Sequence, residues 1–257
     1  MKRTQILTAI TLAVVFGVMV VAGGVVFAKK NQKKAVITMI EGKAHKAKKK
    51  TGPWKAIKKG STLSAKDYLK TDDDSRVEVT FPDQSKLRID QNSLVKMKSL
   101  MAGAGGKRKF DVHLQSGKVW ATVRKAVGGE EKFNVTTENA VAGVRGTIFR
   151  VDYQQEAATV VRVYSGAVAV RNMPVYAKPS HIKKGKRVQV AGPQVISKKQ
   201  WEELIAKEMQ MVKVDANGRM SQADFTSEGE AEDKWVQWNR KLDEQQNAQD
   251  REPVPAK

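Results

Sequence analysis

The side chains that could bind a metal ion or catalyse a reaction are few and far apart. The three histidines, His45, His113 and His181, show none of the short spacings by which neighbouring ligands reach one ion. The acidic run at residues 72–74 lacks the glycine and glutamate of a calcium loop, so we interpret it as an exposed turn. There is no cysteine, which excludes thiolate ligands, thiol nucleophiles and disulfides together. The sequence predicts a protein that is not an enzyme and that has no catalytic residue, metal site or cofactor.

Positive charge is the strongest chemical signal in the sequence, and it is unevenly spread. The net charge of +20 combines +25 over residues 1–200 with −5 over residues 201–257. Between residues 29 and 59, twelve lysines accompany a single acid, Glu41. Beside an anionic surface, each such lysine contributes about 1 kcal/mol of attraction. The candidate contacts with such a surface are Lys29, Lys30, Lys33, Lys34, Lys46, Lys48, Lys49 and Lys50. The alternative is a solvated linker that holds the following domain away from the bilayer.

An uncharged segment near the start of the sequence predicts where the protein resides. Residues 6–28 are 23 consecutive positions without a charge. As a helix they would extend about 34 Å, enough to cross a hydrocarbon core of about 30 Å. Lys2 and Arg3 predict a cytoplasmic N-terminus and export of the rest. We expect a single-pass bacterial inner-membrane protein whose C-terminal domain lies in the periplasm or outside.

The alternative to an anchor is a signal peptide cleaved after Ala28, which would leave a soluble periplasmic or secreted protein. The apolar run exceeds a usual signal-peptide core, and Lys29 and Lys30 follow it at once, so we favour the anchor. Export also changes the interpretation of the lysines. Envelope headgroups or polymers become their expected partners, and nucleic acid does not.

After residue 34 the sequence is typical of short strands separated by turns. Residues 76–81 and 86–90 alternate apolar and polar side chains on either side of a Pro-Asp-Gln-Ser turn, which predicts a hairpin. Further strand–turn–strand patterns have Ser116-Gly117 and Ser165-Gly166 as their turns, and a shorter copy covers residues 184–190. The spacing is irregular, so we expect stacked antiparallel hairpins in a solenoid-like or sandwich-like, mainly β fold.

Helices are expected only near the C-terminus. Capping-box patterns begin at Ser197 and Ser227, and apolar residues at helical spacing follow each of them, over residues 201–212 and 231–242. The second stripe places two tryptophans on one face, and we expect this face to dock on the β domain. The alternative is a partner-binding face formed by Trp235 and Trp238.

Residues 135–151 are the most specific segment of the chain and read VTTENAVAGVRGTIFRV. They resemble the core signature of FecR domains, a Thr-Pro-x-Ala-x-Ala-x-Val-Arg-Gly-Thr-x-Phe-x-Val run. Glu138 stands where proline is common, and Gly143 replaces another small residue. The resemblance extends over about residues 35–190. The signature residues are Ala142, Gly143, Val144, Arg145, Gly146, Thr147 and Phe149.

Arg145 is the only charge within the small-residue part of this signature. Such a tight β segment lets backbones approach closely. We expect the Arg145 side chain to bridge strands through carbonyl groups or a carboxylate such as Glu138 or Asp152. The alternative is a contact with an anionic ligand.

With this resemblance the sequence is divided into five segments. They are residues 1–28 as anchor or signal peptide, 29–34 as a basic juxtamembrane segment, 35–190 as a FecR-like β domain, 191–245 as a helical segment, and 246–257 as a disordered tail.

The resemblance implies an envelope regulator that passes a signal from an outer-membrane receptor to a cytoplasmic sigma factor. In such regulators a cytosolic sigma-binding domain precedes the membrane helix, and here only residues 1–5 precede it. We therefore expect no sigma factor among the partners. The expected function is a non-enzymatic, membrane-tethered module that binds or scaffolds an envelope protein or polysaccharide in signalling. The alternatives are a cleaved periplasmic binding protein and a basic nucleic-acid-binding protein. The oligomeric state is not predicted.

Overall fold

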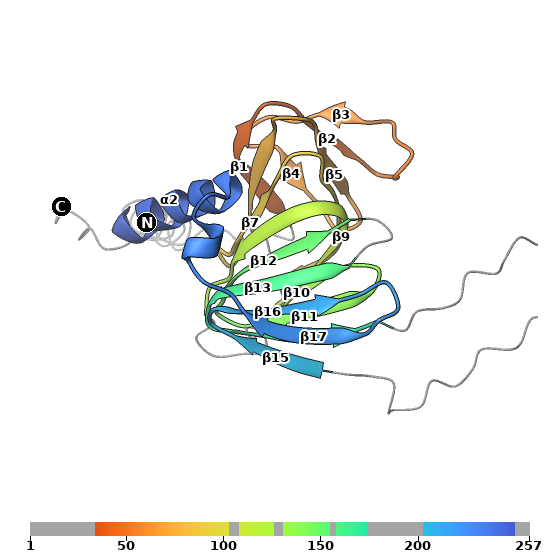
Figure 1. Ribbon diagram of the computed structural model, residues 1–257. Helices are drawn as coiled ribbons and strands as arrows, with labels where there is room; N and C mark the ends of the chain where they lie inside the picture. The colour runs from red at the N-terminus through yellow and green to blue at the C-terminus, as the bar shows by residue number, and fades with distance from the viewer. Residues whose placement is uncertain (1–33, 103–107, 126–130, 155–157, 174–202, 250–257) are drawn as a thin grey trace, which may run out of the picture. The chain divides into compact units, whose positions relative to one another are not determined.

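The computed structural model describes residues 34–102, 108–125, 131–154, 158–173 and 203–249 (Figure 1). The chain divides into two units, Met1–Gln32 and Lys33–Lys257, and every described residue belongs to the second. The expected membrane segment at residues 6–28, the lysines at 29, 30 and 33, and the strand expected at residues 184–190 lie outside the described residues. Within the described ranges, no helix has the length and apolarity to span a membrane.

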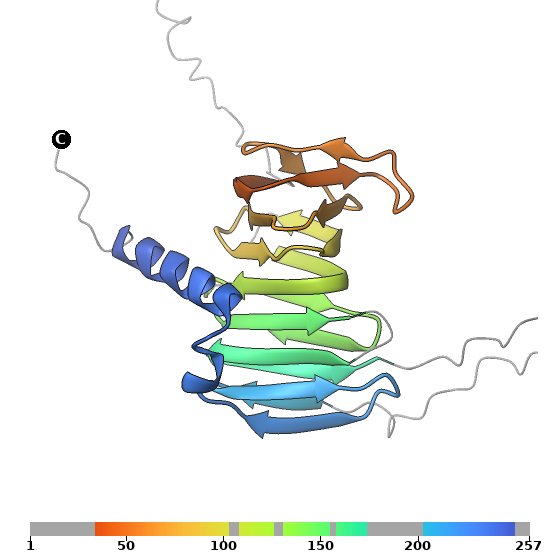
Figure 2. The ribbon, with the colours of Figure 1, turned by 45° about the horizontal axis from the view of Figure 1, so that its top comes forward.

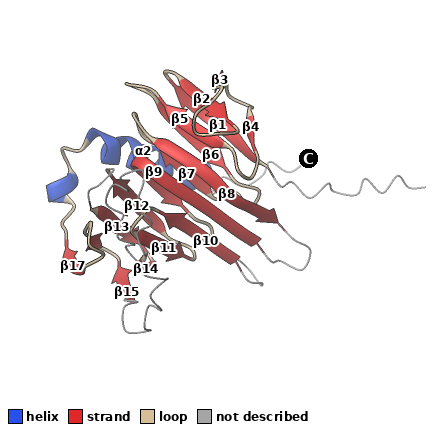
Figure 3. Cartoon of the chain, turned by 90° about the vertical axis from the view of Figure 1, so that its right-hand side faces the viewer, coloured by secondary structure: helices blue, strands red, loops and turns tan. Residues whose placement is uncertain are grey.

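The strands form two sheets that share their longest member. In order, sheet A consists of β4 (Thr62–Leu63), β1 (Ala35–Glu41), β6 (Arg76–Thr80), β7 (Lys86–Ile89), β9 (Arg108–Thr122), β12 (Ile148–Tyr153), β13 (Thr159–Ser165), β16 (Gln210–Val214) and β17 (Met220–Asp224). In order, sheet B consists of β3 (Lys55–Ala56), β2 (Ala44–Ala47), β5 (Tyr68–Thr71), β8 (Leu94–Ala102), β9, β10 (Glu131–Thr136), β11 (Ala140–Val144), β14 (Ala167–Asn172) and β15 (Glu203–Lys207). Every described pairing is antiparallel except β9 with β10, which is parallel. The mainly β fold is confirmed, and strands dominate the view in Figure 3.

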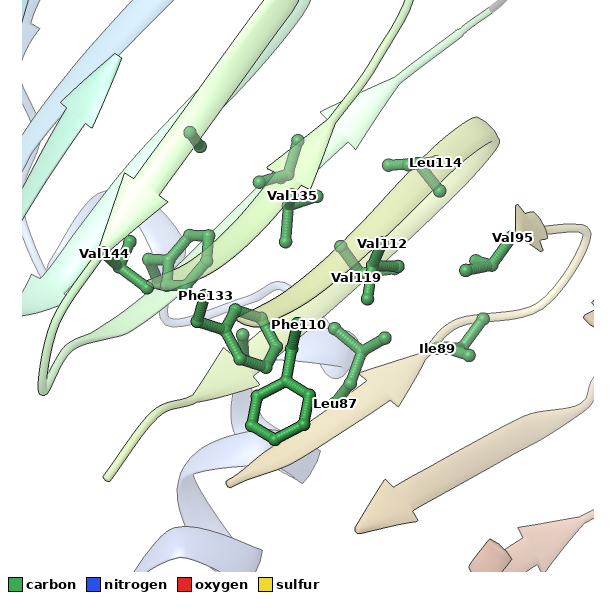
Figure 4. Close-up of a cluster of buried hydrophobic side chains, with 14 of the residues drawn as sticks. Leu87, Ile89, Val95, Phe110, Val112, Leu114, Val119, Phe133, Val135 and Val144 are labelled. Carbon is green, nitrogen blue, oxygen red and sulfur yellow. The ribbon is translucent and has the colours of Figure 1, made fainter. Parts of the chain in front are cut away.

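The apolar core is made of side chains from both sheets (Figure 4). Phe81, Phe110 and Phe133 form its aromatic part, with ring centroids 5.1 to 6.2 Å apart. The predicted hairpin is confirmed as β6 and β7, because Val79 pairs with Leu87. The apolar positions of that hairpin all lie in the core: Val77, Val79, Phe81, Leu87 and Ile89.

The predicted turns at Gly117 and Gly166 are corners between the sheets. β9 pairs with β8 and β10 in sheet B before Gly117 and with β7 and β12 in sheet A after it. Gly166 similarly separates β13 in sheet A from β14 in sheet B, and these two strands pair with other neighbours. The φ angles of +99° and +86° redirect the backbone at one residue, which glycine permits at low cost. The Ser-Gly pattern therefore marks a change of sheet, where the sequence suggested a hairpin.

The first predicted C-terminal helix, over residues 201–212, is wrong. From Glu203 onward this segment forms β15 and β16, and β17 follows. Ala206 pairs with Val168 of β14 and is fully buried, and Val212 pairs with Val161 of β13 and is fully buried. The free edges of both sheets supply backbone partners and apolar cover here. Tertiary pairing therefore overrides the helical spacing of the apolar residues.

The second predicted helix is confirmed. A short 3-10 turn, η3 (Glu228–Glu230), precedes α2 (Lys234–Gln249). Figure 2 shows α2 beside the stacked strands, and its side chains contact the outer face of sheet A. The helix extends four residues beyond residue 245, where the sequence placed the start of a disordered tail.

Candidate functional site

A row of charged and aromatic residues crosses the outer face of sheet A. Strand register places Glu78 opposite Arg88, Arg88 opposite Trp120, Trp120 opposite Arg150, and Arg150 opposite Arg162. Simple alternation would leave this face in water. Instead, Arg88 is 0% exposed, Trp120 is 1% exposed, and Glu78 and Arg150 are each 4% exposed. The C-terminal helix α2 covers this row.

Arg88 is the centre of the contact between sheet A and α2. Its Nε donates to Glu78 Oε2 at 2.9 Å, and its Nη1 lies 2.8 Å from Asp243 Oδ1 of α2. The same Nη1 donates to the backbone oxygen of Asn239 at 3.2 Å. Asp243 also accepts hydrogen bonds from Trp120 Nε1 and Thr122 Oγ1, both at 3.0 Å. One aspartate of α2 therefore joins the helix to two strands, β7 and β9.

A second group of ion pairs fixes the segment that leads into α2. Arg150 binds Asp152 at 2.6 Å and Asp233 at 2.7 Å. Arg162 binds Asp152 and Glu230, each at 2.8 Å. Glu230 belongs to η3, and Asp233 immediately precedes α2. Both ends of this connection are therefore tied to β12 and β13.

The two tryptophans of α2 pack against the β domain. Trp235 is 2% exposed and stacks on Trp238, with ring centroids 5.2 Å apart. The Arg76 guanidinium lies 5.1 Å from the Trp238 ring centre and 5.6 Å from that of Trp235, within cation–π range. Trp238 Nε1 donates to Glu41 Oε1 at 3.1 Å. The expected docking is confirmed, and Trp235 is inaccessible to another partner while α2 is in this position.

The ion pairs keep their carboxylates charged despite burial. Burial acts to raise the pKa of Glu78, but hydrogen bonds from Thr38 and Arg88 and the positive charges of Lys86 and Arg88 outweigh it, so the pKa is lowered. Burial likewise acts to raise the pKa of Asp233, and the hydrogen bond and charge of Arg150 lower it. This arrangement neutralises charge and attaches a helix, which is a structural role.

The histidines and the acidic run do not come together. His45 Nδ1 lies 3.5 Å from Asp72 Oδ1, whereas His113 Nδ1 lies 3.2 Å from Thr136 Oγ1. Asp73 and Asp74 are exposed in the turn between β5 and β6, as predicted. Over the described part of the chain, no three histidine or acidic side chains are placed to hold a metal ion. His181 lies outside that part.

The FecR-like signature forms β11, a corner at Gly146, and β12. Its residues Ala142, Val144, Thr147 and Phe149 are buried, and Thr147 Oγ1 donates to the carbonyl of Ala167 at 3.1 Å. Arg145 lies exposed at the corner, and its expected bridging role stays a prediction.

Within the signature, the arginine that pairs with Asp152 is Arg150, five residues after Arg145, and Arg162 of β13 pairs with Asp152 as well. Sequence reasoning missed both Arg88 and Arg150. The available signal was a charged residue at the outward position of adjacent strands, followed by a tryptophan-bearing helix that needed a face to cover.

Lysines gather at a second place, on the N-terminal part of sheet B. An open groove there is lined by Lys48, Lys49, Lys50, Lys66, Tyr68, Lys96 and Lys98, which we call the lysine groove. Three of the lysines predicted to contact anions are among them. Of the other described candidates, Lys34 is exposed and Lys46 Nζ donates to the carbonyl of Thr62 at 2.8 Å. The fold adds Lys66, Lys96 and Lys98, which are distant in sequence from the predicted block.

Residues 67–169 match the family model described as FecR protein. The resemblance noted in the sequence is thereby confirmed over these residues. Two crystal structures of a "putative anti-sigma factor" from Parabacteroides distasonis ATCC 8503, at 1.65 and 2.50 Å resolution, are also similar. They share 17% and 16% sequence identity with this chain. Each match covers 63% of this chain, with a TM-score of 0.44. The chain spans 61% of the length of those proteins. No curated protein matches the sequence.

The family match corrects one expectation. The prediction that no sigma factor is among the partners is wrong, because it conflicts with the match of residues 67–169 to the FecR family model. That prediction rested on the few residues before the apolar segment, and they say nothing about what the FecR domain itself engages.

Proposed function

We propose that this chain is a membrane-associated signalling regulator whose FecR domain binds a partner in the bacterial cell envelope. The observation that carries the proposal is the difference between the outer faces of the two sheets. On sheet A, α2 covers the central row of side chains from Glu78 to Arg150. On sheet B, most outward side chains of the central strands are half-buried or exposed, including Lys98 of β8 and Lys132 of β10, whereas Thr136 of β10 is buried. We therefore assign partner binding to sheet B.

The match to the FecR family supports a regulatory role, and it covers the strands at the centre of both sheets. The partner is an envelope protein or polysaccharide. The charge of sheet B favours an anionic one, because Lys96, Lys98 and Lys132 all project from its outer face. The location follows from the apolar residues 6–28, which we propose to be an anchor in the inner membrane with the β domain exported.

Site-specific photo-cross-linking in intact cells tests this assignment. A cross-linking amino acid is placed at Lys98 or Lys132 on sheet B and, as a matched control, at Lys241 on the exposed side of α2. Discrete adducts at the two sheet B positions and none at position 241 are expected. Adducts that form only from α2, or none from any position, would contradict the assignment.

Localisation is tested separately. Protease added to spheroplasts is expected to degrade the β domain, and N-terminal sequencing of the mature protein is expected to begin at residue 1 or 2. If the mature protein begins at Lys29, residues 1–28 are a cleaved signal peptide and not an anchor, and the protein is still exported. A β domain that is protected in intact spheroplasts and degraded after lysis would refute the envelope function.

A further inference from the structure

The lysine groove brings together charges from three separate segments. Lys48, Lys49 and Lys50 follow β2, Lys66 precedes β5, and Lys96 and Lys98 belong to β8. Tyr68 of β5 is the one uncharged side chain in its lining. Six ammonium groups around one groove repel each other, which disfavours the folded state unless an anion binds.

The backbone beneath the groove is held in place by hydrogen bonds. Lys66 N–H donates to the carbonyl of Met97 at 2.6 Å, and Met97 N–H donates to the carbonyl of Asp67 at 2.9 Å. Tyr68 pairs directly with Lys96, whose Nζ lies 5.0 Å from the Tyr68 ring centre. The backbone that carries Lys66, Lys96 and Lys98 is therefore fixed, and this lowers the conformational entropy lost when a ligand binds.

Asp67, which precedes Tyr68 of the groove, is an acidic residue whose charge is already paired with a lysine. Asp67 is 3% exposed, binds the Lys48 ammonium, and accepts a hydrogen bond from Ser64 N–H at 2.9 Å. No carboxylate is among the residues that line the groove.

We propose that the lysine groove binds a linear polyanion of the cell envelope, a polymer with phosphate groups repeated along its chain. Asp67 already neutralises Lys48, and a single phosphate carries at most about two negative charges, too few for the five other lysines. Lys96 and Lys98 are two positions apart on one strand, a separation of about 6.8 Å that successive charges of a polymer can follow. This inference rests on the proposed function, because only an exported β domain would meet such polymers.

The test uses the full-length protein in a non-ionic detergent and long-chain inorganic polyphosphate as the probe. The groove variant carries Lys66→Gln, Lys96→Gln and Lys98→Gln. The matched control carries Lys207→Gln, Lys213→Gln and Lys241→Gln, three exposed lysines outside the groove. Affinity is measured by microscale thermophoresis over a series of salt concentrations, and circular dichroism verifies that both variants fold.

The wild-type protein is expected to bind polyphosphate. At the same total phosphate concentration, it should bind orthophosphate far more weakly. Each lysine near an anionic chain contributes about a fivefold effect, so the groove variant should lose on the order of a hundredfold in affinity. The control variant should stay within about threefold, as expected for charges remote from the site. The slope of log affinity against log salt should fall by about three in the groove variant only.

Three outcomes would overturn the inference. Equal losses in both variants would mean attraction by net charge without a site. Absence of polyphosphate binding by the wild type would reject the ligand class. Retention on phosphatidylglycerol vesicles that excess polyphosphate does not displace would assign the groove to the membrane surface. The cross-linking result at Lys132, which is not among the residues lining the groove, does not depend on any of these outcomes, so failure here is distinguishable from failure of the proposed function.

Discussion

Replacing Arg88 by methionine tests how the charged row holds α2. Methionine keeps an unbranched apolar side chain and removes the guanidinium. Glu78 and Asp243, whose side chains are only 6% and 10% exposed, then lose their shared cation. Removing one partner of a buried ion pair typically costs about 3–5 kcal/mol. Glu78 keeps hydrogen bonds from Thr38 and Gln246, so we expect a loss of about 3 kcal/mol in the free energy of unfolding.

The assay is urea unfolding of the full-length protein in a non-ionic detergent, followed by tryptophan fluorescence and by circular dichroism. Trp120, Trp235 and Trp238 lie at the contact between α2 and sheet A, so fluorescence reports on docking of the helix. Circular dichroism near 218 nm reports on the sheets (a wavelength typical of β structure). In the variant, we expect the fluorescence transition at lower urea than in the wild type.

Arg171→Met is the matched control, because Arg171 pairs with Glu203 while 59% and 39% of the two side chains are exposed. An exposed pair contributes at most about 1 kcal/mol, so this variant should stay close to the wild type. If Arg88→Met is no more destabilised than Arg171→Met, the buried row does not hold the helix and the reasoning is refuted.

The same variant should change how stability depends on pH. The folded pKa of Glu78 is below its ordinary value of 4.5, so ionised Glu78 stabilises the protein above that pH. This contribution is lost as the pH falls through the lowered pKa. Without Arg88, Glu78 loses one of the main interactions that lower its pKa. We expect the acid-induced loss of stability between pH 4.5 and lower values to be smaller in Arg88→Met than in the wild type.

Two further predictions concern the corners and sheet B. Gly117→Ala should destabilise the protein by about 3 kcal/mol or more in urea unfolding, because positive φ costs about 1–3 kcal/mol and the new Cβ would also lie 2.0 Å from Ser93 Oγ. Gly60→Ala, also at positive φ but with no atom within 4 Å, should cost only the backbone strain; equal losses would show that the contact with Ser93 is unimportant. Burial, followed by the charge of Lys98, lowers the pKa of His113 below 6.5, so His113 disfavours the fold once the pH falls below that value. His113→Gln should therefore flatten the decline in melting temperature below pH 6.5, and an unchanged decline would contradict this role.

Local patterns predicted the strands well where one face enters the core. The alternation at Val77 and Val79, and at Leu87 and Ile89, identified the hairpin and its inward side, because burial of one face imposes a period of two. The same approach failed at residues 203–212. Their apolar side chains fit a helix or a strand, and the unpaired edges of β14 and β13 decided between the two. No local pattern contains that information.

The candidate sites show the same division. The sequence predicted the lysines at positions 48–50 as contacts for anions, which stays a prediction, and it predicted that the tryptophan face of the second helix docks on the β domain, which is confirmed. It did not reveal that Lys66, Lys96 and Lys98 complete a groove with the first group, or that Arg88 and Arg150 lie beneath the helix. These residues are brought together by strand register, which pairs Tyr68 with Lys96 and Arg88 with Trp120.

By itself, the sequence determined the mainly β class, the FecR domain, the inward face of the central hairpin and the excess of positive charge, because these follow from residue type and short-range spacing. Only the tertiary structure decided that Gly117 and Gly166 are corners between two sheets, that residues 203–214 extend those sheets, and which charges are buried by α2. Each of these depends on which strands lie side by side. Strand neighbours are selected by backbone pairing and core packing between residues far apart in the chain.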